Sequence, residues 1–156
     1  MKRIAFIAIV LTAILLYCKN EAVSSPSGTI DPTFSGKWRG SSTIYKAGQC
    51  SIGGGDSTTN STTMTWTVNT AGDITIQDSV LTTANWTGKI QTNLSISLRK
   101  ILTINCNGTQ TTDTTFYNGT VIKESATYKL NVESVESWCP QRGCVFRVRY
   151  AITKQQ

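Results

Sequence analysis

The chain has 156 residues, a formal net charge of +6 and no histidine. The basic excess is scattered, with no basic run and no cluster of aromatic and arginine side chains, so the composition argues against a nucleic-acid-binding function. Without histidine the commonest general base is missing, and no serine lies in a G-x-S-x-G motif. Glu133 and Glu136 are three apart, so a strand directs them to opposite faces. We expect neither catalysis nor a cofactor.

Residues 1–17 form a predicted export signal. Lys2 and Arg3 provide a positive start, and Ile4 to Tyr17 is an uncharged apolar run of 14 residues. A membrane-spanning helix needs about 20 such residues, so the run is too short to cross a bilayer. A charged start followed by a short apolar stretch is typical of a secretory signal peptide.

The signal ends in Leu15-Leu16-Tyr17-Cys18, which resembles the lipobox of bacterial lipoproteins. The relaxed form of the box, with bulky Tyr17 in place of a small residue, is similar to that of spirochaete lipoproteins. This resemblance implies that Cys18 carries acyl chains such as palmitate, becomes the new N-terminus and anchors the protein in the cell envelope, at the outer membrane. The alternative is an ordinary cleaved signal with an incidental cysteine.

Removal of residues 1–17 leaves 139 residues, which suits one domain. It also leaves 13 basic against nine acidic residues, a net charge of +4. Residues 18–33 are rich in serine and proline, so they predict a flexible tether that follows the acylated Cys18. The composition changes at Phe34, and residues 34–156 form the predicted folded domain.

Four further cysteines indicate disulfide bonds rather than metal binding. They are an even number in a small exported domain, which favours two bridges. We favour pairing Cys139 with Cys144 across the "CPQRGC" loop and Cys50 with Cys106. The alternative is a four-thiolate zinc site, but no C-x2-C pair and no histidine is present, so no metal is expected.

Apolar residues from Phe34 onward recur at every second position, which predicts antiparallel β-sheet with one buried face. "TMTWTVN" and "NLSISLRK" show the alternation most clearly. Turn signals at "NTAGD", "CNGTQ" and "CPQRG" separate the segments. An up-and-down meander of eight strands closing into a barrel is the predicted fold. The expected strands lie near 36–46, 62–69, 73–81, 86–93, 94–106, 110–123, 126–138 and 144–153.

The opening "FSGKWRGSS", residues 34–42, resembles the G-x-W start of lipocalin-like barrels. "TWTVNTAGDITI" followed by "WTGKIQTNLSISL" is similar to the rhythm of small bacterial lipoprotein domains whose function is not known. The resemblance covers most of residues 34–153. It implies that Trp38 packs across the closed end of a barrel and that an arginine covers it, with Arg147 and Arg149 as candidates.

Several exposed-site candidates follow from the pattern, each with a structural alternative. The tryptophans Trp38, Trp86 and Trp138 either contact a ligand or surface partner or, as the more economical reading, fill the core together with Trp66. Residues 51–63 are predicted to be a mobile loop that either carries recognition or is only a tolerated insertion next to Cys50. A surface binder would use this loop together with loop 107–115. The last strand and its flanks carry a predicted basic stripe, which comprises Arg142, Arg147, Arg149 and Lys154. This stripe either contacts an anionic partner or only keeps the strand soluble.

These observations together predict a lipid-anchored envelope protein with a surface binding or adhesion function. Its expected partners are the membrane, through the lipid, and a host or envelope protein or glycan. One alternative is a lipocalin-like carrier of a small apolar ligand. A second is a periplasmic inhibitor of an envelope enzyme.

Overall fold

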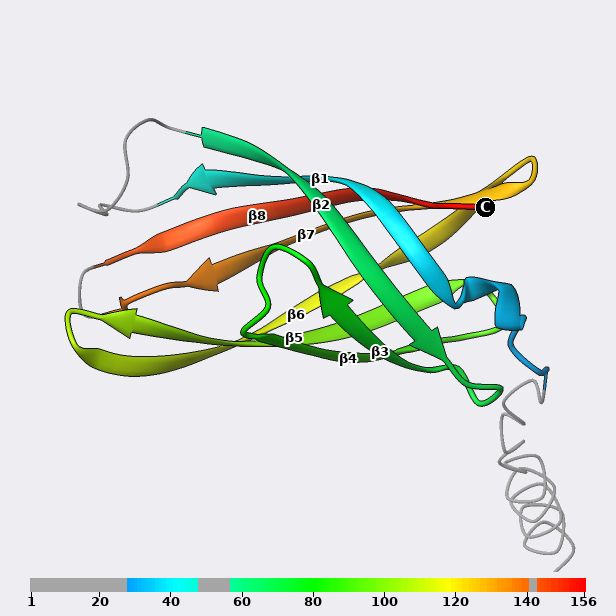
Figure 1. Cartoon of the computed structure of the whole chain (residues 1–156), viewed down its shortest axis with the longest axis horizontal. Helices are drawn as coiled ribbons and strands as arrows, with labels where there is room; N and C mark the ends of the chain where they lie inside the picture. Colours follow the sequence, from blue (N-terminus) through cyan, green and yellow to red (C-terminus); the bar gives the residue numbers. More distant parts are fainter. Residues whose placement is uncertain (1–27, 48–56, 141–142) are drawn as a thin grey trace, which may run out of the picture.

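A computed structural model describes residues 28–47, 57–140 and 143–156. Eight antiparallel strands form a closed barrel in chain order, so that each strand pairs with its neighbours in sequence and β1 pairs with β8 (Figure 1). The predicted all-β, up-and-down barrel is confirmed. The strands are β1 (Gly36–Lys46), β2 (Ser57–Val68), β3 (Asp73–Asp78), β4 (Ala84–Ile90), β5 (Ser95–Cys106), β6 (Thr109–Glu124), β7 (Thr127–Ser137) and β8 (Val145–Lys154).

The two predicted recognition loops are largely strand. β2 begins at Ser57, well before the expected position 62, and β6 begins at Thr109, so the loop predictions for 57–63 and 109–115 are wrong. Threonine is β-branched and favours strands even without apolar neighbours. Residues 51–56 lie outside the described part of the chain.

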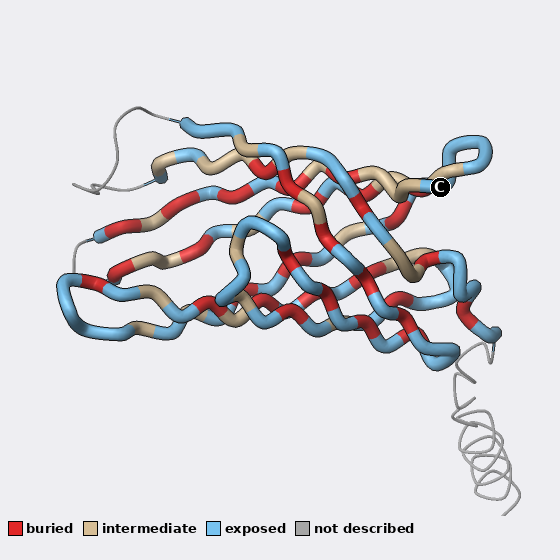
Figure 2. The backbone as a smooth tube through the Cα atoms, in the orientation of Figure 1, coloured by how far each residue is buried: buried red, intermediate tan, exposed pale blue. Residues whose placement is uncertain are grey.

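Burial alternates along most of the strands, so that apolar side chains fill the interior of the barrel (Figure 2). The outer wall is mostly polar, with exposed apolar side chains at Phe116, Ile122 and Val135. On β2, for example, Met64 and Trp66 are buried while Thr63 and Thr65 face outward or lie at intermediate exposure. Side chains on successive residues of a strand point to opposite faces, so a period of two produces this separation. No helix in the described residues has the length and apolar character needed to cross a bilayer.

Two tight turns follow from local residue chemistry. In the β2–β3 turn, Asn69 donates to the Asp73 side chain and accepts from its backbone N–H, both at 2.9 Å. Hydrogen bonds from Asn69, and then from Lys89, hold the pKa of Asp73 below its usual value. In the β5–β6 hairpin, Asn107 and Gly108 have φ of 57° and 84°. Asn-Gly is the preferred pair for such a two-residue turn.

One end of the barrel is closed by the segment that leads into β1, and we call it the entry end. A 3-10 turn, Pro32–Phe34, follows the capping residue Asp31. Phe34 is buried against Tyr128, with ring centroids 4.5 Å apart. Ile30 is also buried and its N–H bonds to the Thr70 carbonyl. Ile30, which falls within the predicted tether of residues 18–33, therefore packs against the barrel.

Trp38 packs across the entry end, as the lipocalin resemblance implied, but no candidate arginine covers it. Its indole stacks on Trp66 with centroids 4.4 Å apart and donates to the Phe34 carbonyl at 3.1 Å. Arg147 and Arg149 project outward from β8, so both are excluded as its cover.

Gly40 permits the close contact of β1 with β8 that closes the barrel. A Cβ atom at this position would lie 1.9 Å from the Ala151 carbonyl oxygen and 2.8 Å from the Ile152 Cα. Both contacts are with backbone, which cannot rotate away. Only glycine fits here without moving one of the two strands.

Candidate functional site

The opposite end of the barrel gathers the cysteines, and we call it the cysteine end. Cys106 is the last residue of β5 at this end, and Cys139 and Cys144 lie in the connection from β7 to β8. In Figure 1 this end lies on the left, away from the 3-10 turn and the C-terminus. Because successive strands run in opposite directions, the β5–β6 and β7–β8 connections lie at the same end of the barrel. The up-and-down topology therefore brings these cysteines together.

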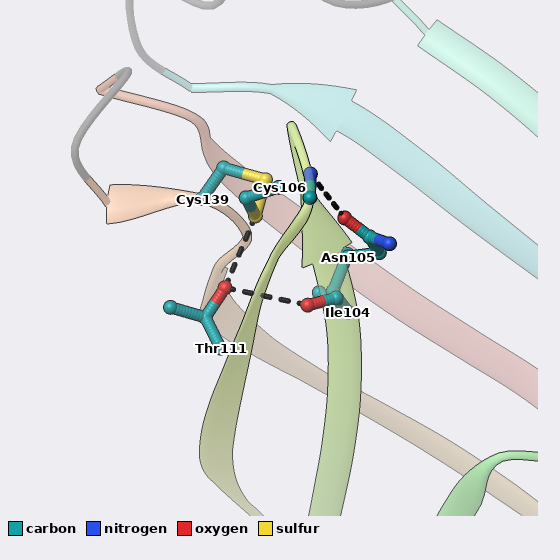
Figure 3. The surroundings of a disulfide bond; sticks show 6 residues. Ile104, Asn105, Cys106, Thr111 and Cys139 are labelled. Carbon is teal, nitrogen blue, oxygen red and sulfur yellow. Dashed lines mark hydrogen bonds between the residues drawn. A yellow bond between two sulfur atoms is a disulfide. The ribbon is translucent and has the colours of Figure 1, made fainter.

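Cys106 forms a disulfide with Cys139, with the two Cα atoms 5.6 Å apart (Figure 3). The favoured pairings of Cys139 with Cys144 and of Cys50 with Cys106 are therefore wrong. The short "CPQRGC" loop favoured the first pairing and left Cys50 for Cys106, whereas the barrel brings the end of β5 next to the end of β7. Thr111 bonds to the Cys106 sulfur at 3.0 Å from the facing strand.

Cys144 is fully buried and is also disulfide-bonded. Cys50 and the acylation candidate Cys18 lie outside the described residues. In a chain of five cysteines, the Cys106–Cys139 bond leaves these two as possible partners for Cys144.

A charged network occupies the interior between the two ends. Lys100 on β5 and Glu136 on β7 are each 1% exposed, and the Lys100 Nζ lies 2.8 and 3.0 Å from the two carboxylate oxygens. Tyr117 and Trp138 also donate to this carboxylate, the latter at 2.6 Å. The Lys100 ammonium further donates to the Tyr150 hydroxyl at 3.1 Å. Buried charges require such partners, and here both have several.

Aromatic rings complete the surroundings of Lys100. Its Nζ lies 5.3 Å from the Trp86 ring centroid and 5.6 Å from that of Tyr150, distances at which a cation is attracted to the ring face. Burial, and then the neighbouring Glu136 charge, raises the pKa of both Tyr117 and Tyr150 far above the usual value. Both phenols therefore act as hydrogen-bonding alcohols. The network supports the barrel and presents no reactive group at the surface.

Three buried polar atoms in the described structure have no hydrogen-bond partner: the Thr62 hydroxyl and the indole N–H groups of Trp66 and Trp86. Trp66 and Trp86 both stand opposite Ile76, on either side of β3, so they belong to one inward-facing row. An unpaired donor inside a protein is costly.

The predicted tryptophan contacts are mostly internal. Trp38 and Trp86 are at most 1% exposed, so they offer no surface to a partner, in agreement with the core reading. Trp138 lies just beyond β7 at intermediate exposure, packed on Phe146 with ring centroids 4.7 Å apart. Of the three, only Trp138 is placed near the cysteine end and partly open to solvent.

The predicted basic stripe is partly neutralised. Arg147 and Arg149 are exposed as expected, but both pair with Glu133 on β7, at 3.3 and 3.0 Å. Lys154 lies at the far end of β8 and donates to the Gln155 carbonyl. Arg142 lies outside the described residues. The described part of the stripe is thus a solvated ion-pair cluster with a separate lysine.

Sequence reasoning missed Lys100 and Glu136, although a signal was present. Ile96, Leu98, Lys100 and Leu102 alternate along β5, and all four are buried. A charged residue that interrupts an apolar face at the correct period indicates a buried charge, and such a charge requires a partner.

Within the described ranges, no group of three or more histidine, cysteine, aspartate or glutamate side chains forms a possible metal site. Comparison with protein-family models, curated proteins and solved structures found no match to this chain.

Proposed function

We propose that this protein is a lipid-anchored binding module of the cell envelope, without catalytic activity, that meets a protein or glycan partner with its cysteine end. The observation that carries the proposal is the separation of the two ends. The chain enters the barrel at Ile30 and Phe34, and the disulfide between Cys106 and Cys139 lies at the other end.

This separation suits presentation from a membrane. If Cys18 is acylated, the 11 residues between it and Ile30 span at most roughly 40 Å. The entry end then faces the membrane and the cysteine end faces away from it. Disulfides persist in an oxidising environment, which agrees with an extracytoplasmic location.

Two experiments test the proposal. Cys18→Ala should move the protein from the detergent phase to the aqueous phase, and unchanged partitioning would contradict the anchor. A photo-crosslinking residue at Gln110, exposed at the cysteine end, should give an adduct on intact cells, whereas one at Ala126, exposed at the entry end, should not. Equal adducts at both positions would contradict presentation by the cysteine end.

A carrier function is the second candidate, favoured by the three unpaired interior atoms of Thr62, Trp66 and Trp86. A ligand that fits them would offer hydrogen-bond acceptors together with apolar surface. The interior position of Trp38, Trp66 and Trp86 leaves less room than an open carrier needs. Native mass spectrometry of the protein from its own envelope should reveal a co-purified molecule if the carrier reading is correct.

A further inference from the structure

One segment of β2 has a strand on one side only. β2 is in register with β1 from Ser57 to Trp66, whereas its pairing with β3 begins at Met64, opposite Asp78. The last contact on that side is the hydrogen bond from the Ser79 N–H to the Thr63 carbonyl. Among the described residues, no strand is in register with the second edge of residues 57–62.

The short length of β3 causes this free edge. β3 has six residues and β2 has 12. At the end of β3, the Asp78 carboxylate accepts hydrogen bonds from the N–H groups of Val80 and Leu81, which turns the chain toward β4. Figure 1 shows the β3–β4 connection ending well short of the tip of β2. The edge therefore lies at the cysteine end.

Nothing in its sequence protects this edge. Natural edge strands usually carry lysine, proline or a bulge that prevents pairing with another chain. Residues 57–62 read Ser-Thr-Thr-Asn-Ser-Thr, with no charge and no proline. Their threonines favour an extended backbone. These threonines can also form side-chain hydrogen bonds with a neighbouring strand. On the side that faces β1, the hydroxyl groups of Thr59 and Thr43 form a hydrogen bond of 3.1 Å.

A groove of about 560 Å³ continues from this edge along the outer wall. It lies beyond the point where β2 and β3 come together. Its lining is almost entirely uncharged, with Asp78 as the exception, and includes Thr63, Thr65, Gln77, Asp78, Thr82 and Asn85.

We infer that residues 57–62 bind an extended segment of the partner protein, which adds a strand to the barrel wall beside β2. Main-chain hydrogen bonds supply the affinity in this mode of recognition, and pockets beside the edge select alternate side chains. The segment that fits carries hydroxyl or β-branched side chains opposite the threonines and places its continuation in the groove. This inference rests on the proposed binding function and names the chemical class of its partner.

A second copy of this chain is a poorer occupant. Two copies joined through this edge would share only six residue positions on each side. A stable protein interface of standard size involves about 20–30 residues on each side. A flexible peptide can pair with the same six residues and continue into the groove.

The direct test uses octapeptides selected from a random display library against the full-length protein. Hydrogen exchange should show that a selected peptide protects amides within 57–62. N-methylation of alternate peptide residues, which removes main-chain donors and keeps the side chains, should weaken binding at least about tenfold. Protection confined to other segments, or no effect of N-methylation, would overturn the inference.

Variants of the edge provide the second test. Ser61→Lys should weaken peptide binding, while Thr75→Lys, on a strand paired on both sides, should not. The backbone N–H groups of Thr59 and Asn60 point to opposite edges of β2, and proline removes the N–H at its own position. Of Thr59→Pro and Asn60→Pro, the variant that loses the N–H facing β1 should disturb the pairing with β1. The other variant should keep the native circular dichroism and lose peptide binding. If the natively folded proline variant binds normally, the inference is wrong.

Self-association is a distinct outcome. Sedimentation would then show a dimer, and hydrogen exchange would show protection of residues 57–62 without peptide. If Ser61→Lys abolished this dimer, the occupant of the edge would be a second copy of the chain, and the inference would be wrong. A third outcome separates the two proposals. If no Gln110 adduct forms on cells but a selected peptide still protects residues 57–62, the proposed function is contradicted and the peptide-binding edge is supported.

Discussion

Lys100 and Glu136 form an ion pair inside the barrel although their strands, β5 and β7, are not neighbours in the sheet. The pair crosses the interior beneath β6, and Tyr117 of that strand donates to the same carboxylate. Three consecutive strands are thus joined through one carboxylate, in addition to the main-chain bonds that join neighbours.

Removal of one partner of this pair should be strongly destabilising. Lys100→Met leaves the Glu136 carboxylate buried without its cation, which costs about 3–5 kcal/mol in free energy of unfolding. The double variant Lys100→Met/Glu136→Leu should recover much of this loss. Guanidinium unfolding measures both, and Lys89→Met, in the exposed pair with Asp73, should cost less than about 1 kcal/mol. A similar cost for both lysines would contradict the buried pair.

Alkaline pH should unfold the protein cooperatively. The pKa of Tyr117 and of Tyr150 is raised by folding, so the protonated phenols stabilise the fold fully below the ordinary value of 10.0. That contribution is lost as the pH rises above this value, because the unfolded chain releases protons that the folded chain keeps. Phenolate absorbance from these residues should appear together with the loss of circular dichroism.

The variant Tyr117→Phe/Tyr150→Phe should remove most of the ionisation that accompanies unfolding, whereas Tyr45→Phe, on a partly exposed residue, should not. Full phenolate absorbance from a natively folded barrel would show that neither phenol is held in the interior.

Peptide mapping without reductant should recover Cys106 linked to Cys139. By elimination among the exported cysteines, it should also recover Cys50 linked to Cys144 if Cys18 carries lipid. The Cys106–Cys139 bond closes a separation of 33 residues, so Cys106→Ala/Cys139→Ala should lower the free energy of unfolding by about 4 kcal/mol in the chain-entropy model. Recovery of Cys139 linked to Cys144 would contradict this connectivity.

Gly40→Ala should weaken the contact between β1 and β8. The added methyl group meets the Ala151 carbonyl, and overpacking of this kind typically costs about 1–3 kcal/mol. Thermal unfolding should show the loss, and Ser41→Ala, one residue along the same strand, serves as the control. Equal stability of the two variants would mean that β1 and β8 are less closely packed than described.

The fold could be predicted because its information is local. Alternation such as Ile96, Leu98 on β5 sets each strand and its buried face, and Asn107-Gly108 sets a hairpin. A meander of strands joined by short turns then needs no further long-range choice. The strand ends were less predictable, since the threonines of residues 57–62 carry no apolar period and extend β2 all the same.

The candidate site depends on relationships that no local pattern contains. The pairing of Cys106 with Cys139 follows from the stagger of β6 against β7, and the free edge at 57–62 follows from the shortness of β3. Both depend on how neighbouring strands align and where each one ends, which no single segment of the sequence specifies. The partner of Lys100 likewise lies 36 residues away.

Trp38 near the start of β1 stands opposite Lys154 at the end of β8, and the Gln155 N–H bonds to the Lys37 carbonyl. The described chain therefore returns to its own starting point. A short linker can join residue 156 to residue 28, and the chain can be reopened between Asn107 and Gly108. In such a circular permutant, a fluorescent reporter attached to either new end would project from the cysteine end, away from the entry end.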